Sequence, residues 1–150
     1  KQLDEVTVPV DELGGLSVAE ALLTPTRIYV EAVRYVMRKC PQAVRALAHI
    51  TGGGITENLN RALPENLDAL VDRGGAEGPA WNVPPVITYM INAAGLTPDE
   101  AYKTFNMGVG MSVICAAEDA TCVQEMLAAE GLETFLMGEI VPGTGKVQYR

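Results

Sequence analysis

Apolar residues recur at two different spacings along the chain, and this pattern predicts a mixture of helices and strands. One set shares a helical face: Tyr29, Val33, Val36 and Cys40. It predicts a helix that begins at Thr24-Pro25-Thr26, because a first turn tolerates proline, and that ends near Cys40. Shorter apolar runs predict strands over residues 46–51, 67–71, 111–116, 133–141 and 146–149.

Capping residues and helix breakers delimit the other predicted helices. Ser17 and Glu20 have the spacing of a capping box, in which two side chains satisfy backbone amides at a helix start. Thr97 and Glu100 repeat this spacing, with Pro98 at the first helical position. Helices are therefore predicted over residues 19–23, 55–63, 86–94 and 118–130, and from residue 98 onward.

The remaining segments are predicted to be loops. Residues 1–15 fit an irregular first segment or a short edge strand, and residues 74–79 a flexible loop. Residues 143–146 are expected to turn between the last two strands as a hairpin. The alternation of helices and strands predicts one layered α/β domain with a mixed sheet.

The composition supports a single folded domain and disfavours some classes of function. The 150 residues include 48% hydrophobic residues and carry a net charge of −8, and a chain of this length buries one sizeable core. The acidic balance disfavours a nucleic-acid partner, which needs clustered Lys and Arg, and no apolar run is long enough for a membrane span. Because the chain begins at Lys1 rather than Met, we expect it to be part of a longer protein.

Three cysteines and one histidine limit the metal and disulfide chemistry. Cys40, Cys115 and Cys122 form no C-x-x-C pair, and His49 is the single histidine. The usual zinc ligand sets therefore cannot form, and we predict no metal site. We expect free, buried thiols, since cysteine is among the most buried residue types.

The segment His49-Ile50-Thr51-Gly52-Gly53-Gly54 is the clearest candidate for chemistry, because a predicted strand leads through three glycines into a helix. Glycines let backbone N–H groups converge, and a helix N-terminus favours negative charge. Thr51 adds a hydroxyl and His49 a titratable donor. A tight turn that needs positive φ, next to a histidine satisfied in the core, fits the same residues. Anion binding and packing both stay open at this point.

Residues 104–111 form a second candidate segment. Gly108 and Gly110 stand just before a predicted strand, where they allow the backbone to approach a ligand or another strand closely. Asn106 offers both a donor and an acceptor. The alternative is a loop that is held only by packing of its apolar side chains.

Arg27 is the third candidate. Near a predicted helix start it is badly placed for the helix dipole, which indicates a carboxylate or phosphate partner. An ordinary capped helix with a surface arginine is the alternative.

Taken in order, three segments of the chain resemble the phosphoribosylformylglycinamidine cyclo-ligase family, also called aminoimidazole ribonucleotide (AIR) synthetase or PurM. The segments are Leu-Leu-Thr-Pro-Thr-Arg-Ile-Tyr (22–29), His-Ile-Thr-Gly-Gly-Gly (49–54) and Phe-Asn-Met-Gly-Val-Gly-Met (105–111). Supporting matches are Glu57-Asn58, Arg61, Leu63-Pro64, Trp81 and Val83-Pro84-Pro85. No single segment is specific, but three in order are.

The resemblance implies that residues 1–150 are the C-terminal domain of a cytoplasmic, homodimeric enzyme, with an α/β (α+β) fold of partly ferredoxin-like topology. In this family an N-terminal domain, absent from this chain, supplies most contacts to ATP and Mg²⁺. The enzyme uses ATP to close the imidazole ring of AIR from formylglycinamidine ribonucleotide, releasing ADP and phosphate. The chain alone is expected to be inactive.

The resemblance also implies roles for individual residues. His49 would position or shuttle a proton at the ring-closing centre, and Asn106 would face the same cleft, so both are expected catalytic residues. The expected phosphate- or substrate-binding residues are Thr51, Gly52, Gly53, Gly54, Arg27 and Gly108. The loop over residues 74–80 is longer than the family pattern predicts and could alter the cleft rim.

Two other classes of function compete with this one. Sister enzymes of the same superfamily, such as formylglycinamidine ribonucleotide synthetase, share the ATP-dependent chemistry, but an Asp-led motif is expected in them where this chain has His49. A non-catalytic interaction module that keeps the fold is the second alternative.

Overall fold

The computed structural model describes residues 3–74 and 78–150. The α-helices are α1 (Val18–Leu22), α2 (Val30–Lys39), α3 (Gly54–Asn60), α4 (Pro85–Ala94), α5 (Pro98–Thr104) and α6 (Ala120–Ala129). The strands are β1 (Val44–His49), β2 (Leu67–Val71), β3 (Met111–Cys115), β4 (Gly138–Pro142) and β5 (Val147–Tyr149). Short 3₁₀ helices are η1 (Leu3–Val6), η2 (Asp11–Leu13) and η4 (Ala117–Asp119).

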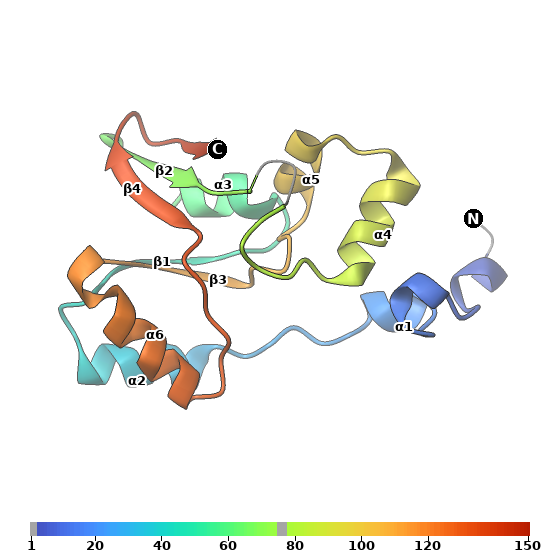
Figure 1. Cartoon of the computed structure of the whole chain (residues 1–150), viewed down its shortest axis with the longest axis horizontal. Helices are drawn as coiled ribbons and strands as arrows, with labels where there is room; N and C mark the ends of the chain where they lie inside the picture. Colours follow the sequence, from blue (N-terminus) through green and yellow to red (C-terminus); the bar gives the residue numbers. More distant parts are fainter. Residues whose placement is uncertain (1–2, 75–77) are drawn as a thin grey trace.

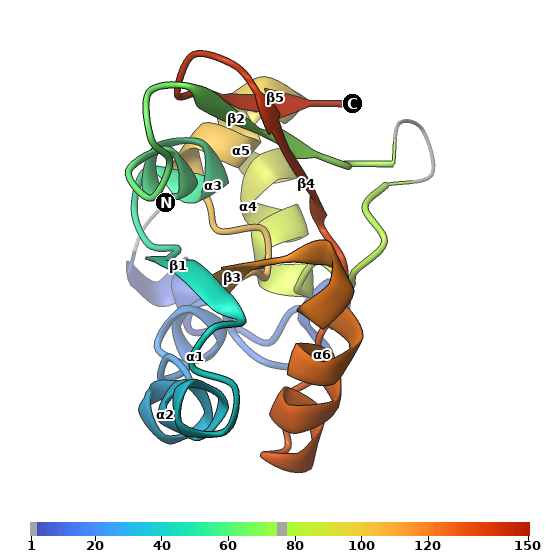
Figure 2. The ribbon, with the colours of Figure 1, turned by 90° about the vertical axis from the view of Figure 1, so that its left-hand side faces the viewer.

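The strands form two separate sheets. β1 pairs with β3 antiparallel, and β2 lies between antiparallel β4 and parallel β5. Figures 1 and 2 show the layers in the order α2 and α6, the β1–β3 sheet, α3 and α5, and the β4–β2–β5 sheet. The N-terminal segment packs beside α4. The prediction of a layered α/β domain is confirmed.

Two apolar clusters hold the layers together. The larger one, between the two sheets, includes Ile50, Ile55 and Val71, each at most 1% exposed. The smaller one includes Ala32 and Val36 of α2, which pack with residues of α6 against the β1–β3 sheet. The ends of β1 and β3 lie beside the larger cluster, so the core fixes the backbone that carries the candidate segments.

Several predicted boundaries are confirmed. Capping boxes begin α1 at Ser17 and α5 at Thr97, and Gly95 ends α4 in the left-handed conformation. β2 covers the predicted residues, and β1, β3, α3 and α6 lie within one to three residues of their expected ends. Local capping and apolar runs were sufficient signals for these elements.

The predicted start of the helix before Cys40 is wrong. α2 begins at Val30, and residues 23–29 are not helical, so Arg27 does not stand at a helix start. A residue before proline is disfavoured in helical conformation, which applies to Thr24. In addition, Leu23 and Ile28 are about four-fifths exposed, at 80% and 82%, so a helix here would have no apolar face to bury.

The predicted hairpin of the last two strands is also wrong. β4 and β5 do not pair with each other, because β2 lies between them. The buried Asp68 carboxylate accepts hydrogen bonds from the amides of Thr144 (2.7 Å) and Lys146 (2.8 Å), which carries the connection across the end of β2. The strand predicted over residues 133–141 is shorter than expected, since only Gly138–Pro142 pairs.

The N-terminal residues form turns of 3₁₀ helix rather than a strand, apart from one isolated bridge between Pro9 and Ser17. Residues 75–77 of the predicted flexible loop lie outside the described residues. In the described part of the chain, no helix is long and apolar enough to cross a membrane. The three cysteines are free thiols, but the expectation that they are buried is wrong, because Cys40 and Cys115 are half-buried and Cys122 is exposed.

Candidate functional site

The pairing of β1 with β3 brings two of the candidate segments together. His49, the last residue of β1, stands opposite Met111, the first residue of β3. Directly after β1, the Ile50 amide donates to the Gly110 carbonyl at 2.9 Å. The 49–54 and 105–111 segments are therefore adjacent in space, although fifty residues of chain lie between them.

The glycine turn packs against the end of α5. Gly53 and Gly54 have φ angles of 92° and 62°, a conformation that favours glycine. A Cβ on Gly54 would lie 2.7 Å from the Phe105 carbonyl oxygen and would also clash with the Tyr102 carbonyl. The third glycine is thus required for close packing, as the packing interpretation predicts.

The side chain of Asn58 stabilises the glycine turn through hydrogen bonds. Its buried Nδ2 donates to the carbonyls of Thr51 (3.3 Å), Gly52 (3.0 Å) and Gly54 (2.8 Å). The Gly54 amide donates to the Thr51 carbonyl at 3.0 Å. Among the described residues, no carbonyl accepts from the amides of Gly52 or Gly53. These two amides, rather than all three, are available to an anion.

The second segment is a tight turn closed by its own side chain. The Asn106 Oδ1 accepts from the Gly108 amide at 3.0 Å, and Met107 has a positive φ of 54°. The Trp81 indole N–H donates to the Met107 carbonyl at 2.9 Å. A Cβ on Gly108 would stand 2.6 Å from Cδ of Pro84. These contacts constrain the conformation of the loop, and the Asn106 Nδ2 remains as a donor.

Tyr29, from the first segment, joins the other two. Its ring meets the His49 imidazole edge-on, with centroids 6.3 Å apart and planes at 67°. It also covers Gly110, where a Cβ would lie 2.8 Å from Cζ of the tyrosine. All three segments therefore meet around Tyr29.

A cavity of about 510 Å³ opens beside Tyr29. Arg27 and Gly108 line it, together with Trp81 and Phe135, whose rings stack with centroids 5.0 Å apart. The cavity brings together two of the predicted site residues. Thr51, Gly52, Gly53, Gly54, His49 and Asn106 are not among its lining residues.

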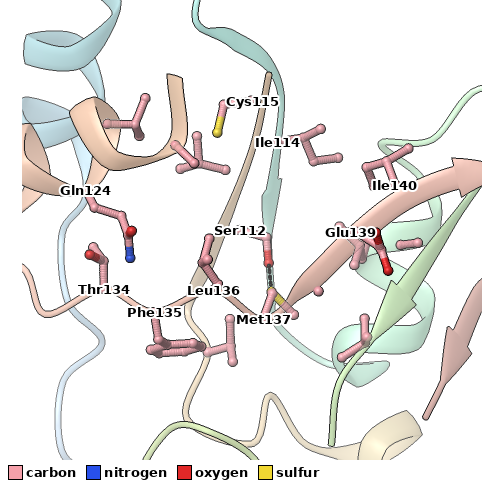
Figure 3. Close-up of a pocket in the computed structure, with 18 of the residues that line it drawn as sticks. Ser112, Ile114, Cys115, Gln124, Thr134, Phe135, Leu136, Met137, Glu139 and Ile140 are labelled. Atoms are coloured by element: carbon pink, nitrogen blue, oxygen red, sulfur yellow. Dashed lines mark hydrogen bonds between the residues drawn. The ribbon is translucent and has the colours of Figure 1, made fainter. Parts of the chain in front are cut away.

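A second cavity, of about 520 Å³, lies between β3, α6 and the segment that leads into β4 (Figure 3). Most of its side chains are apolar, including Ile114, Leu136 and Ile140, and the Ser112 hydroxyl donates to the Met137 sulfur at 3.2 Å. None of the predicted site residues lines this cavity.

The described residues do not fit a metal site. Among them, no group of three or more His, Cys, Asp or Glu side chains gathers as a metal ion would require.

The family "AIR synthase related protein, C-terminal domain" matches residues 7–150. The chain belongs to this family. Similar curated proteins are named phosphoribosylformylglycinamidine cyclo-ligase: that of Brevibacillus brevis is 44% identical over 140 residues, 93% of this chain and 38% of the relative. That of Alkaliphilus oremlandii is 37% identical over 143 residues, 95% of the chain and 40% of the relative. The chain therefore spans about two fifths of the length of these relatives.

Three residues that organise the candidate site of this AIR synthase-related domain were not predicted as site residues from the sequence: Tyr29, Asn58 and Trp81. Each lies in or beside a segment that carries the resemblance. Tyr29 was assigned to the buried face of a helix, whereas it caps α2 and faces His49. Asn58 could have been found from the sequence, because it stands one helical turn after the three glycines. At that position a side-chain amide can donate to several carbonyls of the turn.

Proposed function

We propose that the chain is the C-terminal part of a phosphoribosylformylglycinamidine cyclo-ligase, which closes the imidazole ring of AIR with ATP. The observation that carries this proposal is the meeting of the three family segments around Tyr29, His49 and Gly110. Relatives with this name, 37% and 44% identical, support the same reaction. ATP activates the formyl oxygen of formylglycinamidine ribonucleotide, an amidine nitrogen closes the ring, and ADP and phosphate leave.

In this proposal His49 handles a proton at the ring-closing centre. Its imidazole is exposed at the end of β1, and neutral imidazole can both donate and accept a proton near physiological pH. Asn106 acts beside it as a hydrogen-bond donor through Nδ2, because its Oδ1 is engaged with the Gly108 amide. The tight turn keeps this donor in place, as an organised site requires.

Phosphate binding is proposed for two places. The amides of Gly52 and Gly53 form one. The Thr51 hydroxyl, which donates to Asn58 Oδ1 at 3.4 Å, would turn from that partner to join them, and Gly54 contributes by closing the turn. Arg27 forms the other: it lines the cavity next to Gly108, where a guanidinium can pair with a phosphate in bidentate geometry. The stacked rings of Trp81 and Phe135 provide an apolar part of the lining of the same cavity.

The contacts to ATP and Mg²⁺ are assigned to the additional length that the relatives carry. Mg²⁺ requires oxygen ligands in octahedral geometry, and the described residues gather no cluster that supplies them. We further propose that the complete enzyme is a cytoplasmic homodimer. The sister-enzyme and interaction-module alternatives are not favoured, since the similar proteins are named as cyclo-ligases.

A chimaera tests the proposal. This chain replaces the matching segment of the Brevibacillus brevis relative, and the product is assayed for formation of AIR and release of ADP from formylglycinamidine ribonucleotide and ATP. We expect turnover by the chimaera and none by the isolated chain. A folded chimaera without turnover, or activity of the isolated chain, would contradict the proposal.

A further inference from the structure

The cavity between β3, α6 and the segment before β4 has no part in the proposed reaction. It measures about 520 Å³, and none of the predicted site residues lines it (Figure 3). Small-molecule sites in proteins have volumes of about 300–1,000 Å³. The cavity is therefore large enough to hold an organic ligand of its own.

The walls of this cavity are mostly apolar. Ile114 of β3 and Val123 of α6 contribute to them, together with Leu136 and Ile140. The last two are large apolar side chains that remain 66% and 36% exposed. A ligand with an apolar body would remove this surface from water, and burial of apolar surface favours binding.

Three polar side chains interrupt the apolar walls. Ser112 is only 5% exposed, and its hydroxyl donates to the Met137 sulfur at 3.2 Å, which is a weak acceptor. Gln124 and Thr134 lie toward α6 in Figure 3, and among the described residues neither side chain has a hydrogen-bond partner. A few polar groups in an apolar lining are typical of a ligand site, where they orient the ligand.

The charges around the cavity select against an anionic ligand. No Lys or Arg is among the described residues that line it. Glu133 lines it next to Thr134, and in the described part of the chain its carboxylate has no ion pair. Glu139 also lines it, but its carboxylate is paired with Arg150 at 2.8 Å. A ligand carboxylate would lose water here without gaining a cation.

We propose that this cavity is a binding site for a small, uncharged and mostly apolar molecule that carries one hydroxyl or amide group. The apolar body lies against Ile114, Leu136 and Ile140. The polar group binds Gln124 and Thr134, which supply both donors and acceptors. This proposal does not rest on the proposed function.

The test is titration of the chain with N-phenyl-1-naphthylamine, an uncharged probe that fluoresces in apolar surroundings. Trp81 is the single tryptophan, and it stacks on Phe135, which lines the cavity. Energy transfer from Trp81 to the probe therefore reports binding close to this ring. Competition with 1-octanol and with octanoate, which have equal chain lengths, measures the selection against charge.

Four variants locate the bound probe and its polar contact. Ala120→Phe places a ring at the cavity lining, and Ala128→Phe is the matched control, because Ala128 is exposed on the same helix and does not line the cavity. Leu136→Glu adds a carboxylate to the lining at an exposed position, so the fold should tolerate it. Gln124→Leu removes the polar contact. Thermal unfolding confirms that each variant is folded.

We expect saturable binding of the probe, weakened about tenfold or more by Ala120→Phe and Leu136→Glu and unchanged by Ala128→Phe. Octanol should displace the probe at a concentration about tenfold or more below that of octanoate. Gln124→Leu should weaken octanol binding about fivefold. The proposal would be overturned by a wild-type chain without saturable binding, by a folded Leu136→Glu chain that binds the probe like the wild type, or by equal displacement by octanol and octanoate.

Discussion

The ring of Tyr29 meets the imidazole of His49 edge-on, with 6.3 Å between the ring centroids. Tyr29 belongs to the segment that precedes α2, whereas His49 ends β1. The same tyrosine ring covers Gly110, which leaves no room for a Cβ. Tyr29 therefore restricts the orientation of an otherwise exposed imidazole, and it does so with its ring rather than with a hydrogen bond.

Replacing Tyr29 tests this restriction in the active chimaera. Tyr29→Ala should lower kcat about tenfold, because the imidazole loses its neighbour and its fixed orientation. Tyr29→Phe keeps the ring and should retain most of the activity. Steady-state kinetics separates kcat from KM. Equal losses in the two variants would mean that the hydroxyl, not the ring, is important.

His49→Ala in the same chimaera tests the proton-handling role. Loss of a general acid or base typically costs about 10²–10⁴-fold in rate. Because His49 is exposed, the free energy of unfolding should change by no more than about 0.5 kcal/mol. Urea denaturation of the chain and turnover of the chimaera are measured together. Turnover like that of the unsubstituted chimaera would exclude the assigned role.

Much of the fold follows from local signals in the sequence. Ser17 and Thr97 begin helices through their own side chains, and Gly95 ends one through a left-handed φ, so no distant contact is needed to predict them. Residues 24–29 were mispredicted because their spacing fits a helix, but no layer covers Ile28. Burial by another element is a tertiary property that spacing does not contain.

The candidate site, like the fold, depends partly on local sequence signals and partly on contacts between distant residues. His49, Gly54 and Gly110 stand out in the sequence, yet their adjacency depends on the pairing of β1 with β3. The path of the chain after β4 depends on Asp68, a single carboxylate between two apolar strand positions. Nothing in the local pattern distinguishes this aspartate from a solvent-facing one, so a hairpin was predicted.

The glycine turn offers a matched pair of substitutions. Gly54→Ala should destabilise the chain by about 2 kcal/mol or more, because Gly54 combines a positive φ with backbone carbonyls where a Cβ would lie. Gly52→Ala meets no atom within 4 Å and needs no positive φ, so it should change stability by about 0.5 kcal/mol or less. Urea denaturation measures both. A Gly54→Ala chain as stable as the Gly52→Ala chain would contradict the close packing.

Asp68 should make the stability of the chain depend on pH in the acid range. Hydrogen bonds from the backbone amides of Lys146 and Thr144, and from Gln148, lower the pKa of this carboxyl below its usual value. A carboxyl with a lowered pKa in the folded state stabilises the fold above its unfolded pKa, and this contribution is lost as the pH falls through the folded value. The Asp68→Asn variant, which cannot ionise, should therefore be less stable than the wild type at neutral pH. The difference in unfolding free energy between the two chains should shrink below about pH 4. A constant difference down to pH 2 would show that ionisation of Asp68 does not hold the connection between β4 and β5.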